Sequence, residues 1–563
     1  MKRMFVAGVA LALAGACAQR EGVRKTSDVS AEAMQPGGAA DGGVAAADAG
    51  VQVTQTSPGL RPPAEQPKQS APAVTRTAAG LGLIELPVTQ KDIVNVQLRF
   101  RSGAVDDPPG KAGLTYLTAR VMTEGGTKAL DAKALINALF PLAAELDVRV
   151  DKEQTTFHAR VHKDNLSKLL PILTDVVLHP RWDPAEFKRL REAAINDVEK
   201  RLRQGDDENL GKESLYELMY RNHPYGRLTL GHLSDLKSLQ LADLQAQAGR
   251  VFTADRLIVG VSGGYPPGLG ESLAQSLGKG APPKSAPPAP VPAAHPKGPR
   301  FLLVEKQSDS TAVSMGMPWA LSHDDPDWAA MSVARSAFGE HRQFNGRLMQ
   351  RLREMRGLNY GDYAYLEHFQ QEGGDAATAQ TGRPRSQQYF SIWIRPVRNE
   401  NRLFAVRAAL YELAQSLGPE PFTQDEVEQA KGFLDGYILL FDQTDARKLG
   451  YALDGAFYGM GGFLGAWRAS VRNVTAEQVN AAWGKWIDPA RLQIVLAGTG
   501  MDEVKKALLS GKPTPIQYQR DATGKTPDKP PAQLARDREM EKFPFGARTE
   551  ADVEVVRVEQ MFQ

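Results

Sequence analysis

The chain has 563 residues, 42% of them hydrophobic and 24% charged, a composition typical of globular proteins that excludes a wholly disordered, collagenous or coiled-coil chain. Lys and Arg total 68 and Asp and Glu total 66, so the net charge of +2 gives no reason to expect nucleic acid as a partner. Cys17 is the single cysteine, which excludes an intrachain disulfide and metal sites built from several cysteines.

The first 17 residues have the pattern of an export signal. Two basic residues precede an apolar run over 5–13, which is too short to cross a bilayer as a helix. Small residues then lead to Cys17, which resembles a bacterial lipoprotein signal in which the cysteine is lipidated and becomes the mature N-terminus. Ala14 departs from that pattern, because such signals usually have Leu there, and an ordinary secretory signal is the alternative. We expect a lipid-anchored protein of the bacterial cell envelope, periplasmic or on the outer membrane.

Residues 18–80 are rich in Ala, Gly, Pro, Ser, Thr and Gln, which predicts a disordered tether. A first domain is expected over 81–265, where strand and helix patterns alternate. Its expected strands cover 93–100, 148–161 and 256–263, and its expected helices cover 113–122, 132–144, 166–177 and 184–203.

A Pro- and Ala-rich segment over 266–299 is interpreted as a linker. A second domain is expected over 300–510, opening with a strand at Phe301. Residues 511–563 are expected to form a charged tail, with a possible final strand over 553–558.

Two blocks of the first domain recur in the second. Residues 180–187 resemble 421–427 at an offset of 240, since each places an aromatic residue, a helix cap and a Glu at the start of a long helix. Residues 255–263 resemble 490–498 at an offset of 235. The near-constant spacing predicts a duplicated α+β domain.

A longer series of motifs carries a family resemblance. Gly113-Leu114 opens a helix that is followed by Glu124-Gly-Gly-Thr127, and the second half contains the run 352–360, Leu-Arg-Glu-Met-Arg-Gly-Leu-Asn-Tyr. Together with His223-Pro-Tyr-Gly226 and Phe344-Asn-Gly-Arg-Leu348, these residues resemble the pitrilysin/insulinase zinc peptidases, especially the branch of the mitochondrial processing peptidase. The resemblance spans about 83–500. It implies two homologous α/β-sandwich halves of the inverzincin type, joined by the Pro-rich linker and facing each other like a clam shell around a peptide chamber.

Enzymes of this family carry H-x-x-E-H on the helix that begins Gly-Leu, with two His ligands and a Glu general base. Here Tyr116 stands at the first His, Ala119 at the general base and Arg120 at the second His, while the slot of the third ligand falls near Asp197. Phenol is a poor zinc ligand at neutral pH, and Ala and Arg offer no lone pair. We therefore expect no metal in this chain and no intrinsic catalytic residues. Arg120 is expected either to pair with Asp197 or a neighbour or to be a solvated residue on the helix surface.

The decoys are few. Glu367-His368 ends a truncated version of the motif in a strand-like stretch, and His158 and His162 alternate along an expected strand without a third ligand. We read all of them as ordinary core or surface side chains.

The resemblance also assigns roles to an Arg and a Tyr seven residues apart, which contact the substrate backbone and support the oxyanion beside the zinc. Arg353 and Tyr360 match this pair. It further implies that 96–101 and 148–161 line the chamber wall and could add a strand to a bound peptide.

Some members of the family are heterodimers in which one subunit carries the zinc motif and the other carries only the Arg/Tyr pair. This sequence matches the second type. We expect a non-catalytic, membrane-tethered subunit that binds unfolded peptides and pairs with a zinc-containing paralogue, so that zinc is expected in the partner. The alternatives are a zinc endopeptidase active alone through an unusual site and a catalytically dead peptide-binding or scaffold lipoprotein.

Overall fold

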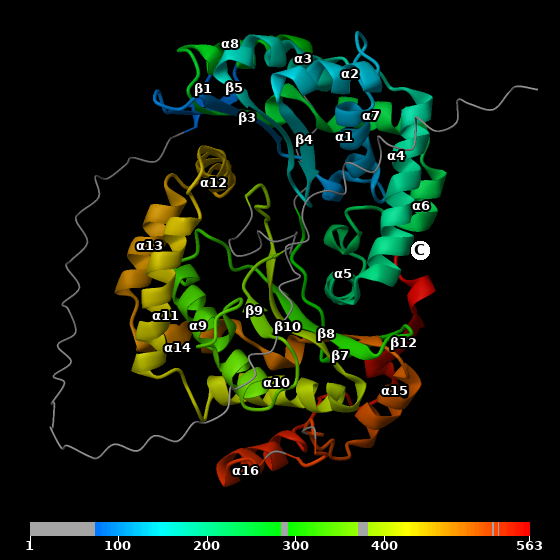
Figure 1. The fold of residues 1–563 in the computed structure, drawn as a ribbon, viewed down its shortest axis with the longest axis vertical. Coiled ribbons are helices and arrows are strands. Elements are labelled where there is room, and N and C mark those ends of the chain that lie inside the picture. The colour runs from blue at the N-terminus through cyan, green and yellow to red at the C-terminus, as the bar shows by residue number, and fades with distance from the viewer. Residues whose placement is uncertain (1–73, 283–290, 370–380, 521–522, 527) are drawn as a thin grey trace, which may run out of the picture. The chain divides into compact units, whose positions relative to one another are not determined.

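The computed structural model describes residues 74–282, 291–369, 381–520, 523–526 and 528–563. The predicted signal over 1–17, Cys17 and most of the predicted tether lie outside the described residues. Residues 69–563 form one compact unit. The described part of that unit is built on two six-stranded sheets with helices packed on both (Figure 1).

The sheet of the N-terminal half has the strand order β1-β2-β6-β3-β5-β4. β2 and β6 are parallel and the other neighbours antiparallel. The inner strands are rich in Val, Ile and Phe because both of their faces are covered. The strands are β1 Thr75–Arg76, β2 Gly82–Pro87, β3 Ile93–Phe100, β4 Glu145–Val150, β5 Thr155–His162 and β6 Leu257–Gly263.

The sheet of the C-terminal half repeats this order as β12-β7-β11-β8-β10-β9, again with one inner parallel pair, β7 and β11. Only the outermost pairing differs, since β12 runs parallel to β7 whereas β1 runs antiparallel to β2. The predicted duplication is therefore confirmed strand by strand. The strands are β7 Arg300–Glu305, β8 Ser310–Trp319, β9 Asp362–Tyr365, β10 Gln388–Arg398, β11 Gln493–Gly498 and β12 Val553–Arg557.

Most helices recur in the same chain order in both halves. Those of the first half are α1 Leu114–Glu124, α2 Ala132–Leu139, α3 Leu166–Leu178, α4 Pro184–Asn196, α5 Asp207–Met219, α6 Leu233–Ser238, α7 Leu241–Val251 and α8 Leu269–Gly280. Those of the second are α9 Trp328–Gly339, α10 Arg402–Leu417, α11 Gln424–Tyr437, α12 Asp445–Phe457, α13 Phe463–Asn473, α14 Ala476–Trp486, α15 Met501–Ser510 and α16 Pro531–Met540. α2 has only a π-helical segment, Met349–Glu354, at its place in the second half, and α16 has no counterpart among the described residues of the first. Within the described ranges, no helix is both long and apolar enough to cross a membrane.

Each half lends one helix to the sheet of the other. α5, from the first half, packs on β8 and β11, and α12, from the second, packs on β2, β3 and β6 (Figure 1). Bare backbone allows the close approach, because a Cβ added at Gly260 of β6 would lie 3.0 Å from Leu449 of α12. Two of the hydrophobic clusters contain side chains from both halves, so the two domains predicted from sequence share packing.

Buried ion pairs reinforce this junction. Arg99 pairs with Asp454, and Arg385 forms a two-pronged pair with Asp151. Both arginines are almost fully enclosed, at 2% and 1% exposed. Buried charges are tolerated only when paired, so these contacts hold the halves in one arrangement.

Three predicted boundaries need correction. Residues 75–76, placed in the tether, form β1. The predicted linker over 266–299 contains α8, which buries Leu273, Ala274 and Leu277 against α3, β2 and β6. The predicted tail is docked rather than free, since α16 packs on α10 and Arg356 pairs with the buried Asp537.

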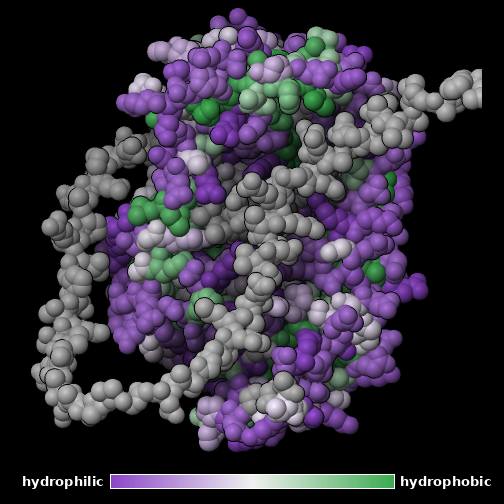
Figure 2. All heavy atoms as spheres, in the orientation of Figure 1, coloured by the Kyte–Doolittle hydropathy of each residue, from purple (hydrophilic) through white to green (hydrophobic). Residues whose placement is uncertain are grey.

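The possible final strand is confirmed as β12. The helix expected over 184–203 changes character at Asp197, where α4 passes into a π-helical segment, Asp197–Gly205. The face of the molecule in Figure 2 is mainly hydrophilic, with apolar residues in small separate groups.

Candidate functional site

The helix expected to carry the zinc motif begins where the sequence predicts. Gly113 adopts a left-handed conformation with φ 88°, and a Cβ there would lie 2.6 Å from Gly231 Cα. The Asp107 carboxylate accepts hydrogen bonds from the N–H groups of Gly113 and Thr115 at 2.9 and 2.8 Å. Burial raises the pKa of Asp107 to about 7 despite these bonds. α1 is thus firmly anchored even though it lacks the family's ligands.

An arginine, Arg120, stands at the last position of the motif. Arg120 Nε donates to Glu124 Oε1 at 2.7 Å and its Nη1 donates to Tyr116 Oη at 3.3 Å. The guanidinium also lies 5.7 Å from the centroid of the Tyr116 ring, within the range of a cation–π interaction. Ala119 is fully buried among core side chains. Arg120 is therefore paired with a neighbour on its own helix, Glu124, and not with Asp197.

Asp197, the candidate for the third-ligand slot, begins the π-helical segment and lies 3.8 Å from Arg201. Its charge contributes to the raised pKa of Tyr116, an effect led by burial. These side chains do not fit zinc. Tyr116 offers a hydrogen-bonded phenol, and Ala119 and Arg120 offer no lone pair. Asp197 alone remains as a ligand, and its carboxylate already lies near Arg201. Across the described ranges, no group of three or more His, Cys, Asp or Glu is placed to hold a metal ion.

The second predicted pair lies in the C-terminal half, at the end of a π-helical segment, Met349–Glu354, and in the loop before β9. Arg353 pairs with Glu354 at 3.2 Å and its guanidinium lies 5.1 Å from the Phe344 ring centroid. Tyr360 is 79% exposed. Among the hydrogen bonds and ion pairs of the described residues, none joins Arg353 or Tyr360 to Tyr116 or Arg120.

The expected strand-adding wall is only partly right. β3 and β5 are each paired on both sides, which leaves no backbone groups for a peptide along 96–101 or 155–161. β4 is one of the two edge strands of the sheet and packs beside α1. Strand addition next to the zinc-motif helix is therefore possible only at β4.

The histidines set aside from the sequence have ordinary surroundings. His368 Nδ1 lies 3.2 Å from Tyr389 Oη, and Glu367 bonds His323 at 2.8 Å instead of His368. Burial lowers the pKa of His158 to about 3, so its ring is neutral. His162 is half exposed beside Asp164.

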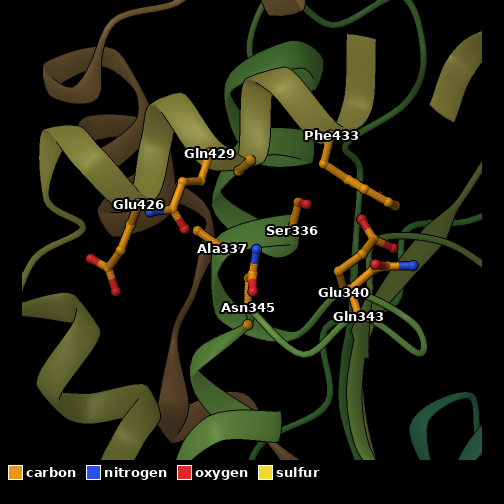
Figure 3. A pocket seen from close by; sticks show the side chains of 10 residues that line it. Ser336, Ala337, Glu340, Gln343, Asn345, Glu426, Gln429 and Phe433 are labelled. Carbon is orange, nitrogen blue, oxygen red and sulfur yellow. The ribbon is translucent and has the colours of Figure 1, made fainter. Parts of the chain in front are cut away.

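Sequence reasoning passed over two neighbouring hollows of the C-terminal half that share Glu340. The first lies between α9 and α11, with Glu340 and Gln343 at one end and Glu426 at the other (Figure 3). The second lies beside it and is lined mainly by aromatic side chains. The signal that could have found them is the Glu340-His341 pair directly after an apolar helix.

Comparisons with known proteins agree with a fold of two related halves. Residues 84–232 match the family model for insulinase (peptidase family M16), and residues 238–434 match the model for the peptidase M16 inactive domain. The chain belongs to the insulinase family, and the two domain models of that family match successive segments of it.

Among its relatives, an uncharacterized zinc protease of Mycobacterium tuberculosis is 24% identical over 75% of this chain and 92% of its own length. The mitochondrial-processing peptidase subunit beta of Saccharomyces cerevisiae is 27% identical over 28% of this chain and 33% of its own. In structure, a peptidase M16 inactive domain from Pseudomonas fluorescens superposes with a TM-score of 0.67 at 22% identity, covering 76% of this chain and 98% of that one.

Proposed function

We propose that the protein is a non-catalytic subunit of an insulinase-type metallopeptidase, which binds peptide and supplies Arg353 and Tyr360 to a zinc-bearing partner. The observation that carries the proposal is the replacement of the metal ligands by a closed contact among Arg120, Tyr116 and Glu124. A fixed cation at that place opposes a dication, and Ala119 supplies no general base. The zinc and the water-activating Glu must then come from a second chain.

Two further features support a peptide-binding role. β4 offers an unpaired strand edge beside α1, where main-chain hydrogen bonds could hold an extended peptide. The phenol of Tyr360 is accessible at 79% exposure, and hydroxyl and guanidinium groups are suitable donors to a carbonyl oxygen that gains negative charge. In the proposed pair, the partner performs the chemistry and this chain orients the substrate.

The location of the pair is part of the same proposal. Cys17 would carry a lipid that tethers the subunit to an envelope membrane, and the tether after it would hold the folded body away from the surface. Unfolded envelope peptides would be the substrates.

The test is affinity purification of the tagged full-length protein from native envelope, with mass spectrometry of the co-purified chains and zinc measured in the same eluate. We expect a stoichiometric partner that contains H-x-x-E-H, and about one zinc per pair. Return of this protein alone would overturn the partner, and return alone with bound zinc would overturn the reading of Tyr116, Ala119 and Arg120.

Variants then separate an active contribution from scaffolding. Arg353→Ala and Tyr360→Phe should each lower the peptidase rate of the pair about 10-fold or more, the scale expected for loss of a transition-state donor. Arg398→Ala, which removes an exposed arginine paired with Glu400, is the matched control and should leave the rate unchanged. If all three variants leave the peptidase rate of the pair at its wild-type value, the result would favour a scaffold role.

A further inference from the structure

The aromatic hollow of the C-terminal half is built like a ligand site. It lies beside α9 and β9 and opens to solvent. Its wall includes Glu340, His341, Tyr365, Tyr437, Phe441 and Trp467.

Two buried polar atoms in this wall lack a partner. Glu340 Oε2 and His341 Nε2 have no hydrogen-bond partner among the described residues, although the two residues are only 3% and 7% exposed. Their other polar atoms are occupied, since Glu340 Oε1 bonds Arg335 and the His341 N–H, and His341 Nδ1 bonds Tyr365 Oη. Buried polar atoms are nearly always paired, so these two are available to a polar group that enters the hollow.

Among the charged side chains that line the hollow, the carboxylates of Glu340 and Glu367 outnumber the single guanidinium of Arg335. Burial lowers the pKa of His341 to about 3, and the nearby cations Arg342 and Lys212 add to this shift, so the ring is neutral. In the tautomer whose Nδ1–H donates to Tyr365 Oη, Nε2 accepts a hydrogen bond. Arg335 balances Glu340, while the Glu367 carboxylate, also in the wall, has His323 rather than an arginine or lysine as its partner. The wall thus combines hydrogen-bond acceptors, two carboxylates against one guanidinium, and several aromatic faces.

The place of the hollow in the duplicated fold supports this interpretation. α9 and β9 correspond by order and position to α1 and β4, and the hollow is lined by residues of both. At the corresponding place in the first half, the chain's own Arg120 lies over an aromatic ring and bonds a carboxylate. The second half also has aromatic rings and carboxylates at this position. Its Arg335 donates a hydrogen bond to only one oxygen, Oε1, of Glu340.

We propose that this hollow binds a primary ammonium group, donated either by a lysine side chain or by the free amino terminus of a peptide. The N–H groups would bond Glu340 Oε2 and His341 Nε2, and the aromatic rings would cover the adjoining methylenes. This assignment goes beyond the proposed role of Arg353 and Tyr360 and does not depend on a partner subunit.

The experiment is a calorimetric titration of the purified protein with three probes. n-Butylammonium chloride represents a lysine side chain, glycinamide hydrochloride represents a free amino terminus, and N-butylacetamide is the uncharged control. We expect one or both ammonium probes to bind, and the tighter one identifies the source. The uncharged control should not bind. Absence of binding by both ammonium probes, or equal binding of N-butylacetamide, would overturn the proposal.

Variants locate the binding. Glu340→Gln and Glu367→Gln should each weaken binding of the ammonium probe about tenfold or more. Glu428→Gln, the same change on the exposed side of α11, should leave it unchanged. Glu367 is less enclosed than Glu340, so its variant keeps the test valid if Glu340→Gln unfolds. Unchanged binding in a folded Glu367→Gln protein would place the ammonium elsewhere and overturn the assignment.

Discussion

The two halves of the molecule have the same sheet order and a largely shared succession of helices, yet they carry different side chains at one corresponding position. In the N-terminal half, Arg120 lies over Tyr116 on α1 and bonds Glu124. In the C-terminal half, α9 and β9 line a hollow in which Glu340 Oε2 and His341 Nε2 have no hydrogen-bond partner within the described part of the chain. The fold is held together by contacts that do not involve these side chains, so the side chains at this position were free to diverge between the halves.

The scaffold depends on contacts that cross between the halves, which are the exchanged helices α5 and α12 and the buried ion pairs. Changes at these contacts should cost far more stability than changes at the zinc-motif residues. The predictions below test that ranking from the largest effect to the smallest.

The largest loss is expected from Arg385→Leu. Burial raises the pKa of Asp151, but the guanidinium of Arg385 outweighs burial and holds that pKa well below its usual range. Removing the arginine leaves a buried charge unpaired, so we expect the free energy of unfolding to fall by about 3–5 kcal/mol. Chemical denaturation at pH 7 measures this loss. Arg160→Ala, at an exposed pair with Glu145, is the control and should cost under about 1 kcal/mol.

The sign of the pH dependence follows from the same pair. A carboxyl whose folded pKa is depressed stabilises the protein above its unfolded pKa of about 4, and the contribution is lost as the pH falls further. The wild-type protein should therefore lose stability below about pH 4 more steeply than Arg385→Leu. Parallel curves for the two proteins would show that the pair does not hold the halves together.

The exchanged helices should matter equally in both directions. Leu449 on α12 and Leu215 on α5 are fully buried, at 0% and 1% exposed. Their replacement by Ala should each cost about 2–5 kcal/mol, measured by urea denaturation, because each change leaves a cavity under a borrowed helix. Leu440→Ala, at a residue that is 41% exposed, should cost well under about 1 kcal/mol. A large effect from only one of the two buried leucines would show that the exchange is reciprocal in geometry but not in energy.

Asp362 on β9 should produce a smaller effect with a distinct pH dependence. Burial raises its pKa to about 7, although Asn359 donates a hydrogen bond to one carboxylate oxygen. Since the folded state holds this proton more tightly, the free energy of unfolding falls as the pH rises from about 4 to 7 and stays low above that. Asp362→Asn removes the ionisation and should stabilise the protein by roughly 1–3 kcal/mol at pH 8, where each pKa unit is worth about 1.4 kcal/mol. Thermal unfolding at pH 5 and pH 8 compares the two proteins, and an equal difference at both values would contradict the assignment.

Much of this fold could be predicted from the sequence because its signals are local. The strand over 93–100 and the helix opened by Gly113 are encoded by alternation and by a glycine that no other residue could replace. The duplication was visible as two blocks at near-constant offset. α8 was missed because the Pro- and Gly-rich composition around it masked the helical spacing of Leu273 and Leu277.

The parts that the sequence could not reveal are non-local. Asp151 and Arg385 are 234 residues apart in the chain, and nothing near either residue indicates the other. The exchange of α5 and α12 likewise follows from how the halves meet, since each helix has an apolar face that would suit its own sheet equally well. The hollow at Glu340 depends on side chains from several elements that only the folded chain brings together.

The smallest effect is expected at the residue that most distinguishes this chain from a zinc peptidase. Arg120 bonds Glu124 four residues along the same helix, and the two side chains are 21% and 38% exposed, so solvent screens much of their attraction. Arg120→Ala should therefore cost under about 1 kcal/mol in urea denaturation, with α1 still held by Gly113 and the carboxylate of Asp107. A loss as large as that of Arg385→Leu would mean that the arginine is a structural replacement for the metal. A small loss would mean that the scaffold tolerates what stands at this place, so that Arg120 reflects relaxed demand for a metal rather than a new support for the fold.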